Sequence, residues 1–454
     1  MKYNRQLIVS AVYTSTPGGD GNPLLEAMPP MLDKEMVTNA LAYFPQIVQN
    51  TDLTLEERLT YLTILSTYFQ PMDYMYTIYS SLYRAIRTTY ISQTMLESIR
   101  TICSAQSDNV PQTVLGKTTQ GESGSILGVP GVGKTSTVLR CLNLMPQVIE
   151  HTEYHGEVFY CKQIPWLFVD CPSDCSVKAL AVKIISAIEK AIGGTLLRAS
   201  ENLASNTMAS LTQHVRVACC NYHIGLIVID EIQNVVNTSQ RMHQKTPLIQ
   251  FLLELTNFSG TAIWMIGTPV AEEIFMAKDH LKRRTRGMRL LPFKKDGAYR
   301  HFLETLWQFQ YTQRHAVLTD ALAKLLYDRT GGIPAYLVQL FKESQAQAIL
   351  TDKPCISVNI INETARLLSI QVPRSYADGT SISDIMVPNL MPSKIEEMRA
   401  DKRQECATLR GRKPARRDEK DLLALSKKEC SLLDEYSASA EPAVRRVRAT
   451  IPQE

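Results

Sequence analysis

A glycine-rich loop supplies the first residues with recognisable chemistry. GVPGVGKT at 128–135 fits the pattern G-x-x-x-x-G-K-[ST] in full, with an apolar run before it and a helical window after it. Glycines let backbone N–H groups surround phosphate oxygens, and the following helix adds its positive N-terminal end. A chance glycine-rich turn is the alternative, but it does not account for the strand and helix on either side. The expected phosphate-binding residues are Gly128, Val129, Pro130, Gly131, Val132, Gly133, Lys134, Thr135 and Ser136.

Two side chains of this loop have separate expected roles. Lys134 would reach the β- and γ-phosphates of a nucleotide, and the Thr135 hydroxyl would ligate Mg²⁺. The loop therefore predicts ATP and Mg²⁺ as the cofactors.

A pair of carboxylates completes the expected site. IVIDE at 227–231 ends an apolar run, and Asp230 follows Thr135 by 95 residues. Asp230 would hold Mg²⁺ directly or through its water shell, and Glu231 would polarise an attacking water. Two carboxylates after a strand are often only solvated, but their distance from the loop and the intervening elements favour a site. The two motifs together predict an ATPase.

Two further features are expected near the same phosphates. The run ending Gly267-Thr268-Pro269 would place the Thr268 hydroxyl near the γ-phosphate if its strand lies between the other two; capping the next helix is the alternative. HLKRRTRG at 280–287 holds four cations. Arg283 or Arg284 would act as an arginine finger on the nucleotide of a neighbouring subunit, and a solvated surface patch is the alternative.

The elements that must position these residues alternate between strands and helices. Apolar strands are expected at 124–128, 165–171, 224–231 and 261–269, with an amphipathic helix at 176–192. Such alternation favours a parallel α/β sheet, whose ligands bind beyond the carboxyl ends of the strands. The candidate catalytic residues follow such ends.

The flanking regions differ from this core. Apolar residues recur at helical spacing over 53–99, and the tyrosines there are expected to pack as the face of a helical module. Beyond Pro373 the chain loses aromatic residues and gains proline, serine and a charged run. The tyrosines in question are Tyr68, Tyr74, Tyr76, Tyr79, Tyr83 and Tyr90.

Composition excludes several classes of protein. The chain has 454 residues, 44% hydrophobic and 21% charged, which predicts two or three folded domains and excludes wholesale disorder. No run approaches the roughly 18 apolar residues of a membrane span. The N-terminus lacks a cleavage pattern, so secretion is not expected. Ten cysteines without metal-ligand spacing indicate reduced thiols in the cytoplasm.

The combined motifs resemble those of a known family. The glycine-rich loop, the strand ending in Asp-Glu, the Gly-Thr-Pro strand end and the arginine cluster are similar to the layout of an AAA+ ATPase. A closer resemblance is to TnsC, the ATPase regulator of Tns-type DNA transposons, and its TniB-like relatives. The segments that carry it are NPLLEAMPP at 22–30, YFQPM at 68–72, PQVIEH at 146–151, GLIVIDEIQNV at 225–235 and MIGTPVAEEIF at 265–275.

This resemblance implies a fold and a division of the chain. The fold would be α/β, an AAA+ P-loop ATPase with a parallel sheet flanked by helices, a helical lid and a mostly helical N-terminal extension. The expected domains are the extension at 1–113, the nucleotide-binding core at 114–295, the lid at 296–372 and a flexible basic tail at 373–454. The lid has Ala335 and Tyr336 where the family's sensor arginine is expected, which makes such an arginine doubtful.

The resemblance also implies partners. The protein would form a homo-oligomer, a ring or a helical filament, on duplex DNA in the bacterial nucleoid, without reading base sequence. It would receive a target from a TniQ- or TnsD-like selector and recruit TnsA- and TnsB-like transposase subunits. DNA contacts are expected at Lys178 and Ser176, by their match to the family, and in a loop with Arg241 and Lys245; surface lysines are the alternative.

Two other functions are compatible with the same motifs. An origin-initiator or clamp-loader-like DNA loader shares the ATPase core and the arginine finger. A nucleotide-gated scaffold with negligible turnover would need no water-polarising carboxylate, so Glu231 argues against it.

Overall fold

The computed structural model describes residues 8–19, 21–48, 53–92, 123–172, 176–194, 207–234, 245–271 and 286–370. By its internal contacts the chain divides into Met1–Gly379 and Thr380–Glu454, and the second unit lies outside the described residues. Among the helices that are described, none is both long and apolar enough to cross a membrane.

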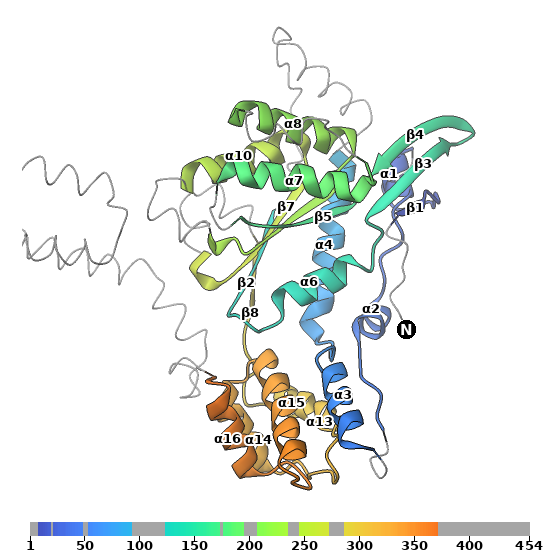
Figure 1. The fold of residues 1–454 in the computed structure, drawn as a ribbon. Helices are drawn as coiled ribbons and strands as arrows, with labels where there is room; N and C mark the ends of the chain where they lie inside the picture. Colours follow the sequence, from blue (N-terminus) through green and yellow to red (C-terminus); the bar gives the residue numbers. More distant parts are fainter. Residues whose placement is uncertain are drawn as a thin grey trace, which may run out of the picture. The chain divides into compact units, whose positions relative to one another are not determined.

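A five-stranded parallel sheet forms the centre of the first unit (Figure 1). Its strands are β5 (Trp166–Asp170), β6 (Leu226–Asp230), β7 (Ala262–Gly267), β2 (Gly124–Gly128) and β8 (Arg286–Leu290), in that spatial order. All neighbouring pairs are parallel. The expected α/β fold is confirmed, and β7 lies between β6 and β2, as the proposed role of Thr268 requires.

Helices cover both faces of this sheet. The β6 strand is buried along its whole length, as expected for a strand that packs on two sides. One face carries Ile227 and Ile229 into a core with α7 (Val177–Ile192), α8 (Met208–Asn221) and α10 (Lys245–Ser259). Helix α6 (Lys134–Leu142) follows the glycine-rich loop and packs with α4 (Asp73–Ser92).

The α4 helix belongs to the core of the sheet domain. Tyr90 donates from its hydroxyl to His223 O at 3.0 Å, and Thr89 Oγ1 accepts from Ala262 N at 3.2 Å. The expected tyrosine packing is confirmed for most of the set. Tyr68, Tyr79, Tyr83 and Tyr90 are buried, whereas Tyr74 and Tyr76 are half-buried.

The α3 helix (Leu55–Leu65) packs elsewhere. It joins the hydrophobic core of the C-terminal helices through Leu62 and Leu65, and the buried Arg58 Nη1 donates to Tyr311 O at 2.8 Å. Of the described helices before residue 93, α3 thus packs with the C-terminal helices, whereas α4 packs against the sheet. The C-terminal helices are α13 (Gly297–Leu306), α14 (Asp320–Thr330), α15 (Pro334–Leu350) and α16 (Val358–Leu367).

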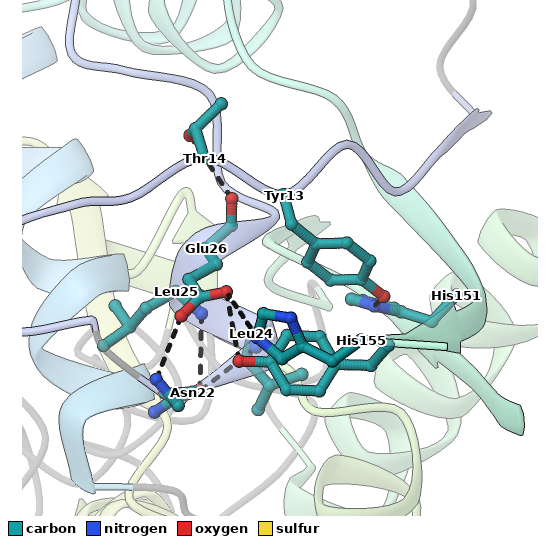
Figure 2. Close-up of polar contacts among 10 residues, drawn as sticks. Tyr13, Thr14, Asn22, Leu24, Leu25, Glu26, His151 and His155 are labelled. Atoms are coloured by element: carbon teal, nitrogen blue, oxygen red, sulfur yellow. Dashed lines mark hydrogen bonds and ion pairs between the residues drawn. The ribbon is translucent and has the colours of Figure 1, made fainter. Parts of the chain in front are cut away.

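A second, three-stranded sheet was not expected from the sequence. It pairs β1 (Ile8–Ser10) with the hairpin of β3 (Val148–Tyr154) and β4 (Glu157–Gln163). The N-terminal segment is held against this hairpin by side chains (Figure 2). Tyr13 OH lies 2.8 Å from His151 Nδ1, and the buried Glu26 carboxylate accepts from Tyr154 OH at 3.0 Å.

The NPLLEAMPP segment has a structural role in this arrangement. It forms α1 (Pro23–Glu26) and precedes α2 (Lys34–Leu41). Asn22 caps α1 through Leu24 N, and its amide donates to Tyr90 O at 2.9 Å. This segment therefore ties the N-terminus to α4.

Candidate functional site

The glycine-rich loop adopts a conformation that depends on its glycines. Gly131 and Gly133 have φ values of 84° and 90°, in the left-handed region that L side chains rarely adopt. A Cβ at Gly131 would also lie 2.9 Å from Ile333 Cγ2. Gly133 is the N-cap of α6 and has no side chain to bond to the first N–H groups of α6, as expected for an anion site at a helix N-terminus.

Lys134 lies folded over the loop. Its Nζ donates to Gly128 O at 2.8 Å and to Val129 O at 3.1 Å. Burial lowers the pKa of Lys134, and the charges of Asp230 and Glu231 oppose that effect. The ammonium group thus lies at the loop and in the field of both motif carboxylates.

Thr135 and Asp230 meet between α6 and the end of β6. Thr135 Oγ1 donates to Asp230 Oδ2 at 2.6 Å, and Asp230 is 3% exposed. A hydroxyl and a carboxylate are hard oxygen donors, which suit Mg²⁺ when substrate phosphates complete its shell. No group of three or more His, Cys, Asp or Glu that could hold a metal occurs in the described part of the chain. As hard oxygen donors in contact with each other, Thr135 and Asp230 fit a Mg²⁺ that is shared with a nucleotide.

Glu231 and Thr268 lie at adjacent strand ends. Glu231 is exposed and has φ 55°, and its own N–H donates to Asp230 Oδ1 at 2.7 Å. Thr268 follows β7, and its carbonyl accepts from Ala271 N at 2.9 Å to close the turn. Gln233 joins the two residues: Thr268 N donates to Gln233 Oε1 at 3.0 Å, and the Gln233 amide donates to Glu231 Oε2. Sequence reasoning did not single out Gln233, although it lies in the quoted GLIVIDEIQNV segment.

A cavity of about 630 Å³ adjoins the glycine-rich loop. Its walls come from the loop, the α3–α4 connection, the segment after β8 and the start of α15. Phe69, Tyr74 and Phe293 provide aromatic surface, and Lys294 and Lys342 provide positive charge. This volume lies within the range of pockets for nucleotide-sized ligands. The sequence predicted the loop but neither the aromatic residues nor the two lysines as part of the site.

The start of α15 contacts the loop directly. Ala335 N donates to Gly131 O at 3.1 Å, so the residue at the doubtful sensor position meets the loop through its backbone. Lys342, two turns further along α15, lines the cavity, and its Nζ lies 3.4 Å from Ser66 Oγ. A positively charged side chain is thus present on α15, but at Lys342 and not at the position where a sensor arginine was expected.

The candidate DNA contacts are only partly covered. Ser176 caps α7 by accepting from Ala179 N at 3.0 Å, and Lys178 is half-buried in the first turn of α7. Lys245 begins α10, where only its backbone is described. Arg241, Arg283 and Arg284 lie outside the described residues. The DNA contacts and the arginine finger remain predictions.

Comparison with known proteins identifies the domain that contains the glycine-rich loop and the Asp230–Glu231 pair. Residues 117–275 match the family described as "AAA domain". With the parallel five-stranded sheet and its flanking helices, the fold is that of an AAA+ P-loop domain. No curated protein matches the sequence.

Solved structures with a similar course of the chain share little sequence with it. The ORC2 protein of Aeropyrum pernix in its ADPNP–ADP complexes has a TM-score of 0.36 and 12% identity, over 54% of this chain and 61% of that chain, so less than two thirds of its length is spanned. The Walker-type ATPase PABY2304 of Pyrococcus abyssi has a TM-score of 0.37 and 13% identity, over 74% and 89%. A chain of Drosophila ORC bound to DNA has a TM-score of 0.41 and 12% identity, over 88% and 90%.

Proposed function

We propose that this protein is a Mg²⁺-dependent ATPase. The observation that carries the proposal is the 2.6 Å contact between Thr135 and Asp230 at the end of β6, beside Lys134 and the glycine-rich loop. The hydroxyl, the carboxylate, the lysine and the loop N–H groups come from two strand ends and one helix start, and they occur together in P-loop nucleotide sites.

The residues divide the chemistry among themselves. The loop N–H groups and Lys134 hold phosphate oxygens, while Thr135 and Asp230 hold the metal. A bound Mg²⁺ would neutralise phosphate charge in the transition state. Glu231, exposed at the strand end next to Asp230, accepts a proton from the attacking water. The aromatic cavity beside the loop takes the base and ribose, which excludes water from that part of the nucleotide.

We further propose that the ATPase acts on duplex DNA as a TnsC-like regulator of transposition. Support comes from the segments that resemble this family, which include NPLLEAMPP and the Asp-Glu-Ile-Gln stretch. In this proposal ATP drives assembly into a ring or filament, and Arg283 or Arg284 completes the site of the neighbouring subunit. A TniQ- or TnsD-like selector and TnsA- and TnsB-like transposase subunits are the partners. Lys178, with Ser176 nearby, contacts the DNA phosphates, which makes binding salt-dependent.

One set of variants tests the ATPase. Lys134→Ala removes the cation at the loop and is expected to weaken ATP binding about 10- to 100-fold, the effect of losing charged hydrogen bonds. Lys324→Ala, on the exposed side of α14, is the matched control. Glu231→Gln is expected to bind ATP normally and to hydrolyse it about 100-fold or more slowly. Normal ATP binding by Lys134→Ala would overturn the assignment.

The role on DNA needs a separate comparison. Turnover and assembly are measured with and without duplex DNA, and then with a TnsB-like transposase. Recruitment of the transposase only by the ATP-bound assembly supports transposition. DNA-dependent assembly that never recruits the transposase favours the DNA-loader alternative, and assembly without measurable turnover favours the scaffold.

A further inference from the structure

Gln233 lies between Glu231, the proposed proton acceptor, and Thr268, which the sequence predicts near the γ-phosphate. Its Oε1 accepts from Thr268 N at 3.0 Å, and its Nε2 donates to Glu231 Oε2. The neighbouring Gly267 makes this approach possible, because a Cβ at Gly267 would lie 2.8 Å from Gln233 Oε1. The side chain therefore bridges the ends of β6 and β7.

The orientation of the Gln233 amide follows from its partners. A backbone N–H can only donate, so the group facing Thr268 N must be the carbonyl oxygen. The NH₂ group on the same carbon is then directed toward the Glu231 carboxylate. The bridge consequently presents a donor, and not an acceptor, to Glu231.

The backbone around Glu231 is held in a conformation that supports this bridge. Glu231 has φ 55°, which is uncommon for a residue other than glycine and costs on the order of 1 kcal/mol or more. Ile232, which is fully buried, donates from its N–H to Ile266 O at 3.0 Å. Asn234 N donates to Glu231 O at 3.0 Å. The bond of Ile232 thus ties the turn to β7, and the bond between Asn234 N and Glu231 O closes it.

We propose that Gln233 is a positioning residue for Glu231. It occupies one carboxylate oxygen and leaves the other to accept a proton from water, and it links this orientation to the end of β7, where Thr268 lies. The inference rests on the proposed ATPase function and adds a residue to it. The competing explanation is that Gln233 only stabilises the turn between β6 and the following segment.

Two substitutions at Gln233 separate these explanations. Gln233→Met keeps the length of the side chain and removes both hydrogen bonds. Gln233→Glu keeps an acceptor for Thr268 N but has no donor for Glu231. If Gln233 only stabilises the turn, the glutamate variant should keep wild-type turnover as long as amide exchange shows that the contact with Thr268 N survives.

The first readout requires no nucleotide. Amide hydrogen exchange in the peptide covering 262–271 reports the Thr268 N–H bond. We expect faster exchange in Gln233→Met and near wild-type exchange in Gln233→Glu. Faster exchange in both variants, or in neither, would contradict the bonding that the proposal requires.

The second readout compares the effect of each variant on ATP affinity with its effect on turnover. Both Gln233 variants are expected to bind ATP within about twofold of the wild type, because neither touches the glycine-rich loop. Turnover is expected to fall about 10- to 100-fold, the range associated with a misplaced catalytic group. Asn234→Ala, which loses the contact of its side chain with Cys171 O and keeps the Gln233 bridge, is the turn control and should turn over normally. Normal turnover in Gln233→Met or in Gln233→Glu would overturn the proposal.

A double variant tests whether Gln233 acts through Glu231. Once the Glu231 carboxylate is removed, Gln233 has no catalytic group to position. Turnover in the double variant of Glu231→Gln and Gln233→Met should therefore be no slower than in Glu231→Gln alone. A further 10-fold loss in the double variant would assign Gln233 a separate role. Failure of the ATPase proposal itself looks different, since the wild type would then turn over no faster than Lys134→Ala.

Discussion

Asp230 shows how the site stabilises a buried charge. A carboxylate that is 3% exposed is costly unless hydrogen bonds and opposite charge compensate for the lost water. Thr135 donates to one of its oxygens and Glu231 N to the other, and Lys134 interacts with it electrostatically. The phosphate side of the site is therefore organised by contacts within the protein itself.

A second buried ionisable residue, His223, gives a prediction about pH. It lies between α8 and β6, is 4% exposed, and its Nδ1 has no hydrogen-bond partner among the described residues. Burial lowers the pKa of His223 to about 4, and the nearby His151 adds to the effect. Its unfolded pKa is higher, near the ordinary value of about 6.5. The unfolded state thus binds more protons, and stability is lost as pH falls from about 6.5 toward 4.

Replacement of His223 should remove this pH dependence. His223→Asn suits the positive φ of 43° at this position. Between pH 7.5 and pH 5 the free energy of unfolding should fall by about 2 kcal/mol more in the wild type than in the variant. The reason is that the pKa of His223 is lower in the folded than in the unfolded state. Urea unfolding at the two pH values measures the difference. Equal losses in both proteins would show that His223 is not held neutral by burial.

At the residue level, the sequence predicted groups that lie within contiguous motifs. Lys134, Thr135, Asp230 and Glu231 could be assigned because local spacing and the preceding strands define their positions. Gln233 could not, because its role depends on the distance between the ends of β6 and β7, which only the folded sheet sets. Its signals in the sequence were its proximity to Glu231 and its place in the GLIVIDEIQNV segment.

The secondary-structure elements show a similar division. The four expected strands of the large sheet are apolar runs, and all four are present. The β3–β4 hairpin was missed because its residues are largely polar or exposed: in β4 only Gln163 is buried. The hairpin is stabilised by residues that are distant in the sequence, such as Tyr13, whose hydroxyl lies 2.8 Å from His151 Nδ1. Periodicity shows which face of a helix is buried, but not what covers it, and so the packing of α3 was not foreseen either.

The position of α3 leads to a prediction for that helix. Leu65 is fully buried in the core shared with the C-terminal helices, whereas the adjacent Ile64 is 39% exposed. Leu65→Ala should lower the free energy of unfolding by about 2–5 kcal/mol, and Ile64→Ala should change it by well under 1 kcal/mol. Denaturant unfolding provides the comparison. A similar small loss in both variants would mean that α3 does not contribute to this core.

For the molecule as a whole, the cavity is where separate parts of the chain converge. The α3–α4 connection carries Phe69, the start of α4 carries Tyr74, the segment after β8 carries Phe293 and Lys294, and α15 carries Lys342. A nucleotide in this cavity would touch the glycine-rich loop of the sheet domain and the C-terminal helices at once. Binding energy would therefore be available to fix the C-terminal helices against the sheet, which gives the proposed ATP-dependent assembly a physical basis.

No residue proposed for the nucleotide site belongs to the C-terminal unit. Thr380–Glu454 separates from the rest of the chain by its contacts, and the residues from 371 onward lie outside the described part. Within 399–420 the sequence has nine Lys or Arg and four Asp or Glu, so the segment carries an excess of positive charge. Such a run is often only solvated. We expect it instead to dock the transposase or nearby DNA phosphates.

Removal of the chain after residue 372 should therefore separate two activities. ATP hydrolysis and ATP-dependent assembly on duplex DNA should persist, because every residue proposed for the nucleotide site precedes this point. Transposase recruitment should weaken, and any phosphate contribution of the tail should fade steeply with added salt, as counterion release requires. A full-length variant with the nine cations of 399–420 changed to glutamine controls for length and should share the recruitment defect. Full transposition by the truncated protein would refute a docking role, whereas loss of ATP binding would place the domain boundary further along the chain.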